Sequence, residues 1–341
     1  PFVSLCTPTF NRRPFIHHII KCVENQDYPM DRMEWIIVDD GTDPIEDMVK
    51  DIPYVKYHRY ETKMSLGKKR NVMHEKCKGD ILVYIDDDDY YPPCRVSHAV
   101  DTLTKNPDVL CVGSSEMYIY FKHINKMYSF GPYAANHATA ATFAFRKELL
   151  LQTSYDEDVY VGEEKKFLKN YTIPFKQLDP RKSILVFSHI HNSFDKKKLL
   201  TGEQKGTYRE IDVKVEDIIT EADALNFFMK DIDVILEEYR PGDPSVKTDV
   251  NMYIRIMEKT REDVAMSMNA KMQGVITNME ADLNNQKRVY ETRIGFLTKE
   301  NITLKDKLDQ TNEKMRSVLS ECIELKKTMK MRAEFVQRNL V

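Results

Sequence analysis

Four adjacent aspartates at positions 86–89 follow five apolar residues at positions 81–85. A buried strand cannot carry four neighbouring negative charges into a core, so we expect the strand to end there and release the carboxylates into a polar cleft. Adjacent carboxylates repel one another strongly at low dielectric constant. A divalent cation relieves this repulsion, and hard oxygen ligands suit Mg²⁺ or Mn²⁺. The run therefore predicts a metal site, although an acidic turn in solvent would have the same composition.

The first 200 residues alternate short apolar runs with amphipathic stretches, which predicts an α/β fold with a mostly parallel sheet covered by helices. Strands are expected at residues 2–6, 35–38, 54–57 and 81–85, and helices at residues 14–26, 43–50 and 67–77. Sheets of this kind bind ligands at the carboxyl ends of their strands. The aspartates at 86–89 would lie at that edge.

Three more polar segments follow expected strands or open expected helices, and so belong to the same edge of the sheet. They are Thr-Pro-Thr-Phe-Asn-Arg at 7–12, Asp-Asp-Gly-Thr at 39–42 and Gly-Lys-Lys-Arg-Asn at 67–71. An Asp-Asp-Gly sequence alone is also a common turn. The order and spacing of all four segments together indicate one nucleotide-binding site.

In this order the segments resemble the family 2 glycosyltransferases of the GT-A fold, a Rossmann-like α/β fold. The resemblance covers roughly residues 1–195, including Ile-Asp-Asp-Asp-Asp-Tyr-Tyr-Pro-Pro-Cys-Arg at 85–95, and none of the tail. It implies an enzyme that transfers a sugar from a nucleotide-sugar donor. A UDP-sugar is the expected donor, with GDP-sugars and dTDP-sugars as alternatives.

The resemblance also implies which residues bind the donor. Phe10 would flank the nucleotide base, Asp40 would contact the edge of the base, and Arg70 would lie near the nucleotide. His137 opens a run of small residues that would line the sugar site, although that run could equally be a core strand. The other expected donor-binding residues are Thr7, Asn11, Arg12, Lys69 and Asp86. A solvent-exposed helix start is the alternative for Lys69.

The expected metal ligands are the Asp86 and Asp88 carboxylates. In the family that this chain resembles, the corresponding pair binds the ribose and the metal-bridged diphosphate. Asp89 fits an extension of that motif, and Asp87 fills its variable position, where we expect no role. The departing diphosphate carries about two negative charges, which bound Mn²⁺ or Mg²⁺ would stabilise. His189, with His191 in reserve, could reach the metal or the diphosphate, although a structural role is as plausible for either.

An inverting transfer also needs a general base for the acceptor hydroxyl. The resembling family places an acidic pair, usually Glu-Asp, at the start of a helix, and its second acid is the base. Here the pair is Glu163-Glu164, so Glu164 takes the base position and Glu163 is the alternative. Favourable charge in the first turn of a helix would explain the same pair without catalysis.

Composition narrows the class of protein. The chain has 341 residues, 51 basic and 54 acidic, and this balance argues against nucleic-acid binding through a basic patch. Its six cysteines include no Cys-X-X-Cys pair and are expected to be reduced. No apolar run approaches the ~18 residues of a membrane span, and no signal peptide is evident. We expect a cytoplasmic protein. Its Lys-rich and Asn-rich usage is typical of AT-rich genomes, including those of large DNA viruses, in which case the host cytoplasm is expected.

Three parts are expected: a catalytic domain at residues 1–200, a helical connector at 201–244 and a helical tail at 245–341. Apolar residues recur at helical spacing in the connector, and Pro-Gly-Asp-Pro at 241–244 ends it. In the tail, two rows of residues repeat every seven positions. One row is Tyr290, Leu297, Leu304, Thr311, Val318, Leu325 and Arg332, and the other is Ile294, Asn301, Leu308, Met315, Cys322, Met329 and Val336.

Together these features predict a metal-dependent, inverting glycosyltransferase with an oligomerising coiled coil, acting on a glycan or a glycosylated protein. The rival interpretation is a structural scaffold that only binds sugar and works through its coiled coil. For the tail, the rival is one long amphipathic helix that folds back on the first domain. Because the candidate site residues all precede residue 200, truncation near Pro244 is expected to leave an active monomer.

The two heptad rows predict self-association through residues ~270–336, because a lone helix cannot remove so narrow an apolar stripe from water. Asn301, at a core position, favours a parallel dimer over a trimer. Light scattering of the full-length chain at micromolar concentration should give the mass of an oligomer. A monomeric mass would instead support the folded-back helix.

Overall fold

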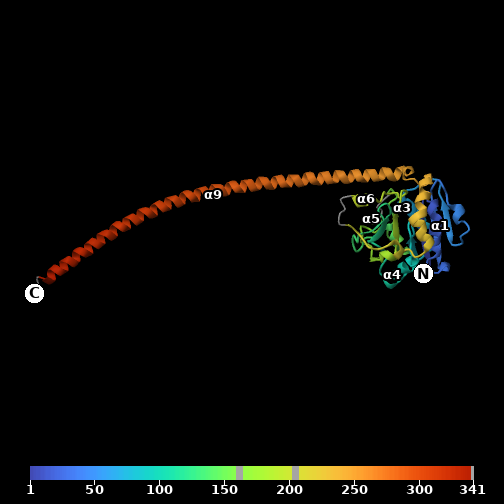
Figure 1. Cartoon of the computed structure of the whole chain (residues 1–341), viewed down its shortest axis with the longest axis horizontal. Helices are drawn as coiled ribbons and strands as arrows, with labels where there is room; N and C mark the ends of the chain where they lie inside the picture. Colours follow the sequence, from blue (N-terminus) through green and yellow to red (C-terminus); the bar gives the residue numbers. More distant parts are fainter. Residues whose placement is uncertain (159–163, 202–206, 339–341) are drawn as a thin grey trace. The chain divides into compact units, whose positions relative to one another are not determined.

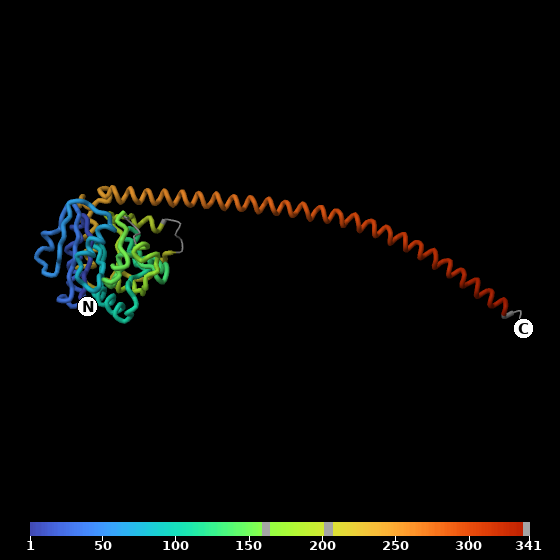
Figure 2. Tube along the Cα trace, turned by 180° about the vertical axis from the view of Figure 1, so that it is seen from behind, coloured from blue at the N-terminus to red at the C-terminus, as the bar shows by residue number. Residues whose placement is uncertain are grey.

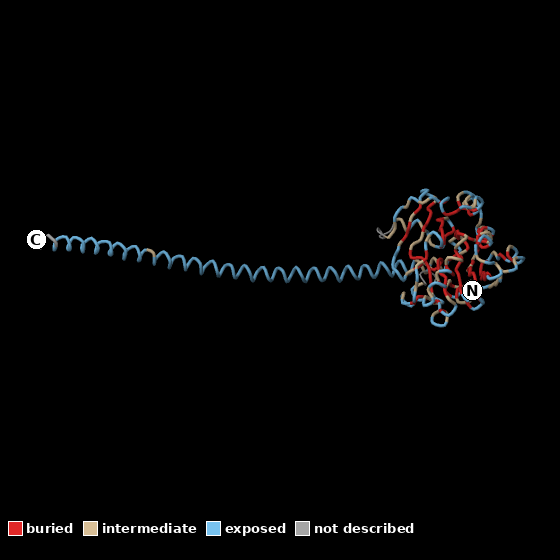
Figure 3. The backbone as a smooth tube through the Cα atoms, turned by 90° about the horizontal axis from the view of Figure 1, so that it is seen from below, coloured by how far each residue is buried: buried red, intermediate tan, exposed pale blue. Residues whose placement is uncertain are grey.

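The computed structural model describes residues 1–158, 164–201 and 207–338. The chain divides into two compact units, Pro1–Met257 and Glu258–Val341. The first unit contains the strands and the short helices, and the second is a continuous helix (Figures 1 and 2). The buried residues gather in the first unit, whereas the second is exposed along its length (Figure 3). A packed interior therefore belongs to the first unit.

The first unit is built on a seven-stranded, mostly parallel sheet, which confirms the expected α/β class. Its strands run in the order β3 (Val55–Arg59), β2 (Met33–Asp39), β1 (Val3–Thr9), β4 (Ile81–Tyr84), β8 (Ala144–Arg146), β5 (Cys111–Gly113) and β9 (Phe175–Gln177). β8 pairs antiparallel with β4 and β5, whereas the other described pairings in this sheet are parallel. The expected strands are β1 to β4, and they form one half of the sheet.

Helices cover both faces of this sheet because the apolar residues of its strands point alternately to either side. Trp35 and Ile37 of β2 face a core shared with α1 (Arg13–Glu24) and α4 (Arg95–Lys105). Ile36 and Val38 face the opposite core, together with α3 (Leu66–Lys76). The expected helices are α1, α2 (Glu46–Val49) and α3, whereas α4 was not expected.

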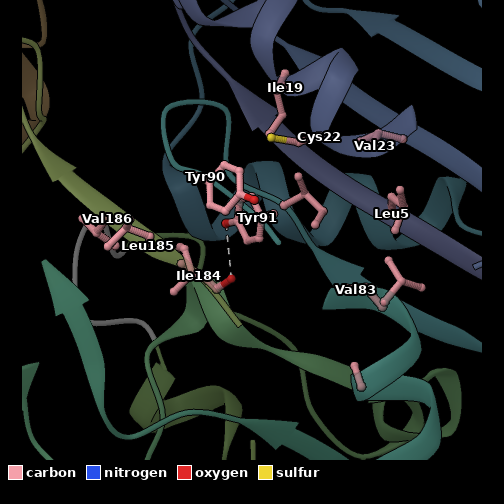
Figure 4. Close-up of a cluster of buried hydrophobic side chains, with 14 of the residues drawn as sticks. Leu5, Ile19, Cys22, Val23, Val83, Tyr90, Tyr91, Ile184, Leu185 and Val186 are labelled. Atoms are coloured by element: carbon pink, nitrogen blue, oxygen red, sulfur yellow. Dashed lines mark hydrogen bonds between the residues drawn. The ribbon is translucent and has the colours of Figure 1, made fainter. Parts of the chain in front are cut away.

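A second sheet extends the larger core cluster. Its strands run in the order β10 (Leu185–Ser188), β6 (Met117–Phe121), β7 (Lys126–Phe130) and β11 (Tyr208–Glu210). Tyr90, just after the acidic run, bridges to Leu185 of β10 through two backbone hydrogen bonds of 3.0 and 2.9 Å. Figure 4 shows Tyr90 and Tyr91 packed between the residues of β10 and those of α1 and β4. The segment after β4 is therefore fixed from both sides.

The expected connector, residues 201–244, is only partly helical, because it contains β11 of the second sheet. Its later part packs into the first unit and includes α7 (Ala222–Asn226), a π-helical turn (Phe227–Asp231) and α8 (Ile232–Glu238). The Phe228 ring stacks on Phe187 of β10 at 4.3 Å and meets the His18 ring of α1 edge-on at 4.5 Å. Two further short α-helices of this unit are α5 (Glu164–Phe167) and α6 (Lys198–Thr201).

The tail is a single helix, α9 (Thr248–Arg338), of 91 residues. Its first turns belong to the first unit, because the division between the units falls after Met257 rather than at the expected residues 241–245. Apolar side chains of the heptad rows, such as Leu308 and Leu325, are exposed. Pairing with a second copy stays a prediction. No helix among the described residues has both the length and the hydrophobicity needed to cross a membrane.

Phe228→Ala should lower the free energy of unfolding of the first unit by ~3–5 kcal/mol, because it removes a buried ring from the contact between α1 and β10. Val234→Ala is the matched control on α8, where the side chain is 64% exposed. That substitution should cost less than ~0.5 kcal/mol. Urea unfolding followed by tryptophan fluorescence measures both changes. A loss below about 1 kcal/mol for Phe228→Ala would contradict the observed packing of the connector.

Candidate active site

A cavity of about 330 Å³ lies where β1 and β4 end. It is built from segments that are distant in the sequence. The expected site residues in its wall are Phe10, Arg12, Lys69, Arg70, Asp86, Asp88 and Glu164. The structure thus brings most of the expected donor-binding residues, the acidic run and the expected base to one place. All the lining residues belong to the first unit.

The acidic run begins immediately after the apolar part of β4, as expected. The Tyr91 hydroxyl accepts a hydrogen bond from the backbone N–H of Asp86 at 2.7 Å. The Thr7 hydroxyl donates one to the carbonyl of Ile85 at 2.6 Å. These contacts hold the turn so that Asp86, Asp87 and Asp88 line the cavity, whereas Asp89 is buried outside its wall.

Arg12 lies beside two of these carboxylates. Its guanidinium lies 3.6 Å from Asp87 and 3.4 Å from Asp88, and all three side chains are largely buried. Burial opposes ionisation of Asp88, yet Arg12 and His189 hold the pKa of that carboxyl well below its usual range. Burial and the charge on Asp88 raise the pKa of Asp87 to about 7, although Arg12 opposes this rise. Asp87, expected to have no role, is thus a partner of Arg12 in the cavity wall.

The carboxylates of the acidic run place hard oxygen ligands in the cavity wall, and this is the property that suits a bound cation. His189 is the nearest histidine, with Nε2 3.5 Å from a carboxylate oxygen of Asp88 and a side chain only 1% exposed. Burial lowers its pKa to about 4, which keeps the imidazole neutral near pH 7, the form that binds metals. Among the described residues no three acidic, His or Cys side chains converge on one point. A cation held by Asp86 and Asp88 would therefore need further oxygen ligands, such as those of a diphosphate.

His191 does not line the cavity. Its backbone carbonyl accepts a hydrogen bond of 2.9 Å from Arg12, and its ring packs against Gly242, where a Cβ atom would lie 2.7 Å from Nδ1. Of the two expected histidines, His189 is therefore the one beside the acidic run. His191 instead helps to hold Arg12 and the segment that precedes α9.

Three ammonium groups surround the ring of Phe10. Lys63, Lys69 and Lys247 have Nζ atoms 4.7, 5.8 and 6.0 Å from the ring centroid. Asp40 lies outside the cavity wall and orients Lys69, one of these three lysines. Its carboxylate pairs with Lys69 and accepts a hydrogen bond of 2.6 Å from the backbone of Met64. The Phe10 face is thus an aromatic surface in a positively charged part of the cavity, which suits an anionic ligand with a flat ring.

Arg70 is fixed by two aromatic rings. Its guanidinium carbon lies 4.9 Å from the ring centroid of Tyr84 and 5.2 Å from that of Tyr155. Stacking of this kind suits arginine because its planar cation is only weakly hydrated. Arg70 thereby brings a permanent positive charge to the same wall as Asp86.

Besides Asp40, three expected donor-binding residues lie outside the cavity wall. The Thr7 hydroxyl accepts a hydrogen bond of 2.8 Å from the Trp35 indole within the core. Asn11, with a φ of 53°, accepts one of 2.7 Å from the backbone of Thr42 and so joins the loops after β1 and β2. The His137 ring contacts aromatic side chains at the protein surface. Thr7 and Asn11 shape the backbone around the cavity.

Glu164, the expected base, lines the cavity. It is the first residue of α5, and its carboxylate accepts a hydrogen bond of 3.2 Å from the backbone of Ala140. Thr139 and Ala141 line the same wall, as expected of a run of small residues. Glu163, the alternative base, lies outside the described residues. The choice between the two acids stays open.

Several cavity residues were not expected, and most of them come from segments without a motif. They are Lys63, Met64, Leu66, Ser193, Phe194, Lys247, Val250 and Ile254. Lys63 and Met64 precede α3 directly, so the position of that helix could have suggested them. No local pattern points to Lys247, Val250 and Ile254, because they lie far along the chain, where α9 begins.

Residues 4–159 match the family model described as Glycosyl transferase family 2. The chain is 28% identical over 100 residues to the poly(ribitol-phosphate) beta-N-acetylglucosaminyltransferase TarS of Staphylococcus aureus, across 26% of this chain and 16% of that protein. It is 30% identical over 117 residues to the glucosyl-dolichyl phosphate glucuronosyltransferase of Haloferax volcanii, across 33% of this chain and 37% of that protein. The chain thus spans well under half the length of these relatives.

Two solved structures are similar to about half of this chain. A structure of S. aureus TarS 1–349 in complex with UDP-GlcNAc has a TM-score of 0.45 and 20% identity, covering 55% of this chain and 58% of that one. A structure of the mannosyltransferase PcManGT from Pyrobaculum calidifontis with GDP-Man and Mn²⁺ has a TM-score of 0.44 and 20% identity, covering 54% and 56%.

Proposed function

Residues 4–159 belong to glycosyl transferase family 2, and from this premise we propose that the chain is a metal-dependent, inverting glycosyltransferase. It would move a sugar from a nucleotide-sugar, with a UDP-sugar as the expected donor, to a glycan or a protein-linked glycan. The observation that carries the proposal is the single cavity that unites the acidic run, three basic side chains at motif positions and Glu164. A protein that only bound sugar would not need these opposed charges together.

The donor would bind across the ends of β1 and β4. Phe10 offers its ring face to the base, and the ammonium groups around it favour an anionic ligand. Arg70, held against two tyrosine rings, presents its charge in a fixed position, so that little conformational entropy is lost on binding. Arg12 limits the repulsion between the carboxylates and the incoming phosphates. Each residue would therefore bind or orient the donor.

Asp86 and Asp88 would hold the Mn²⁺ or Mg²⁺ ion, and that ion would supply positive charge to the departing diphosphate. The position of both carboxylates in the cavity wall supports this assignment, as does the neutral imidazole of His189 beside Asp88. Asp87 and Arg12 would keep the two ligands in place. Glu164 would accept the proton of the acceptor hydroxyl as that oxygen attacks the sugar, in a single displacement that inverts the anomeric centre.

Loss of the proposed metal ligand should remove the response to metal and leave the fold intact. In a thermal-shift screen of nucleotide sugars with Mn²⁺, the wild-type chain should be stabilised by its donor class, because only a ligand of the native state raises the melting temperature. Asp88→Asn should abolish the Mn²⁺-dependent part of that shift. Asp101→Asn, an exposed change of the same charge on α4, is the control.

Two results of that screen would contradict the proposal. A wild-type chain that neither binds nor hydrolyses any nucleotide sugar would favour a scaffold. Mn²⁺-dependent turnover that is unchanged in Asp88→Asn would show that the metal, if used, is held elsewhere.

Glu164→Gln should lower turnover by at least ~10²-fold and leave donor affinity nearly unchanged, because the lost carboxylate acts on the acceptor proton. Glu148→Gln, an exposed change of the same kind, is the control. Steady-state kinetics with the identified donor and acceptor measure both. If Glu163→Gln is inactive and Glu164→Gln is not, the base is Glu163. If both variants keep full activity, the proposed mechanism is wrong.

A further inference from the structure

Lys247 lies one residue before α9, yet its side chain reaches the cavity. The residue is 6% exposed, and its Nζ donates a hydrogen bond of 2.7 Å to the Ser193 hydroxyl. The same Nζ lies 6.0 Å from the centroid of the Phe10 ring. Val250 and Ile254, from the first turns of α9, line the cavity beside it. A segment outside the matched residues 4–159 thus closes part of the wall.

The backbone around Lys247 is tied to both sides of the cavity. The Asn11 carboxamide donates a hydrogen bond of 2.7 Å to the carbonyl of Pro241. Tyr239 donates one of 2.7 Å to Asp43. Asp249 forms an ion pair with Lys63, which itself lies over Phe10. Because the loops that carry Asn11 and Lys63 also carry cavity residues, Lys247 is held in place rather than exposed on a loose linker.

The electrostatic environment of Lys247 lacks a fixed counterion. Among the described residues it forms no ion pair, and the partner of its ammonium group is the neutral hydroxyl of Ser193. Burial and then repulsion from Arg12 lower its pKa to about 7, although Asp88 and Asp87 favour the charged form. Removing an ammonium group from water without a carboxylate partner is costly. An anionic ligand in the cavity would offset that cost.

We propose that Lys247 binds the diphosphate of the nucleotide-sugar donor, so that the start of the long helix completes the donor site. This inference rests on the proposed function and extends it to a residue far from the sequence motifs. Lys247 lies in the wall that also holds Phe10, for the base, and the acidic run, for the metal. A diphosphate bound between Phe10 and the acidic run would lie beside Lys247. The buried ammonium group of Lys247 has no acidic partner among the described residues.

The test separates phosphate binding from base binding in the full-length chain. Isothermal titration would use UDP, GDP and dTDP, each beside its own nucleoside, on the wild-type chain and on Lys247→Met. The substitution should weaken diphosphate binding by ~10–100-fold, the range for a lost charge-assisted hydrogen bond, and change nucleoside binding by less than ~2-fold. Lys247→Arg should retain most of the affinity. Lys259→Met, an exposed change on the same helix, should have no effect.

The outcomes that overturn the inference are distinct. If the wild-type chain binds a diphosphate and Lys247→Met binds it equally well, Lys247 is not a phosphate ligand. If diphosphate and nucleoside binding fall together, its role is structural. If Lys247→Met does not fold, Lys247→Gln replaces it, since glutamine keeps a hydrogen-bond donor for Ser193. A wild-type chain that binds none of the three diphosphates overturns the proposed function, and this assignment with it.

Discussion

The structure depends on keeping three carboxylates together at the end of a buried strand. β4 delivers Asp86, Asp87 and Asp88 into a cavity that shields them from water, and such charges repel one another strongly. The Arg12 guanidinium lies 3.6 Å from Asp87 and 3.4 Å from Asp88, and burial together with the charge on Asp88 raises the pKa of Asp87 to about 7. A site in this condition favours positively charged ligands at the acidic run.

Contacts from several elements hold the backbone of the acidic run in place. The Tyr91 hydroxyl and the Thr7 hydroxyl fix the backbone of the turn. Tyr90, held between β10 and the core below α1, prevents the segment after the run from moving away. The second sheet thereby acts on the site although none of the described lining residues lies in its strands. The same contacts therefore stabilise the fold and position the acidic run.

The lysine side chains on the other side of the cavity differ in their partners. Lys69 is neutralised by Asp40, and Lys63 by Asp249, so both are anchored by acids of their own. Lys247 differs because its partner is a serine. The first turns of α9 belong to the first unit, whereas the exposed heptad rows lie in the second unit. The expected truncation near Pro244 would remove Lys247, Val250 and Ile254 from the cavity wall.

Local sequence determined the strands, the first helices and the core of the site. Apolar periodicity is a local property, so β1 to β4 and α1 to α3 follow from it, and the polar residues after each strand meet because parallel strands end at one edge. Only the tertiary structure decided which polar side chains face the cavity. Thr7 and Asn11 bind backbone instead, and Asp40 holds Lys69, because their partners come from other loops. Lys247 lies in the cavity wall because segments distant in the sequence pack together, and no spacing along the chain indicates such packing.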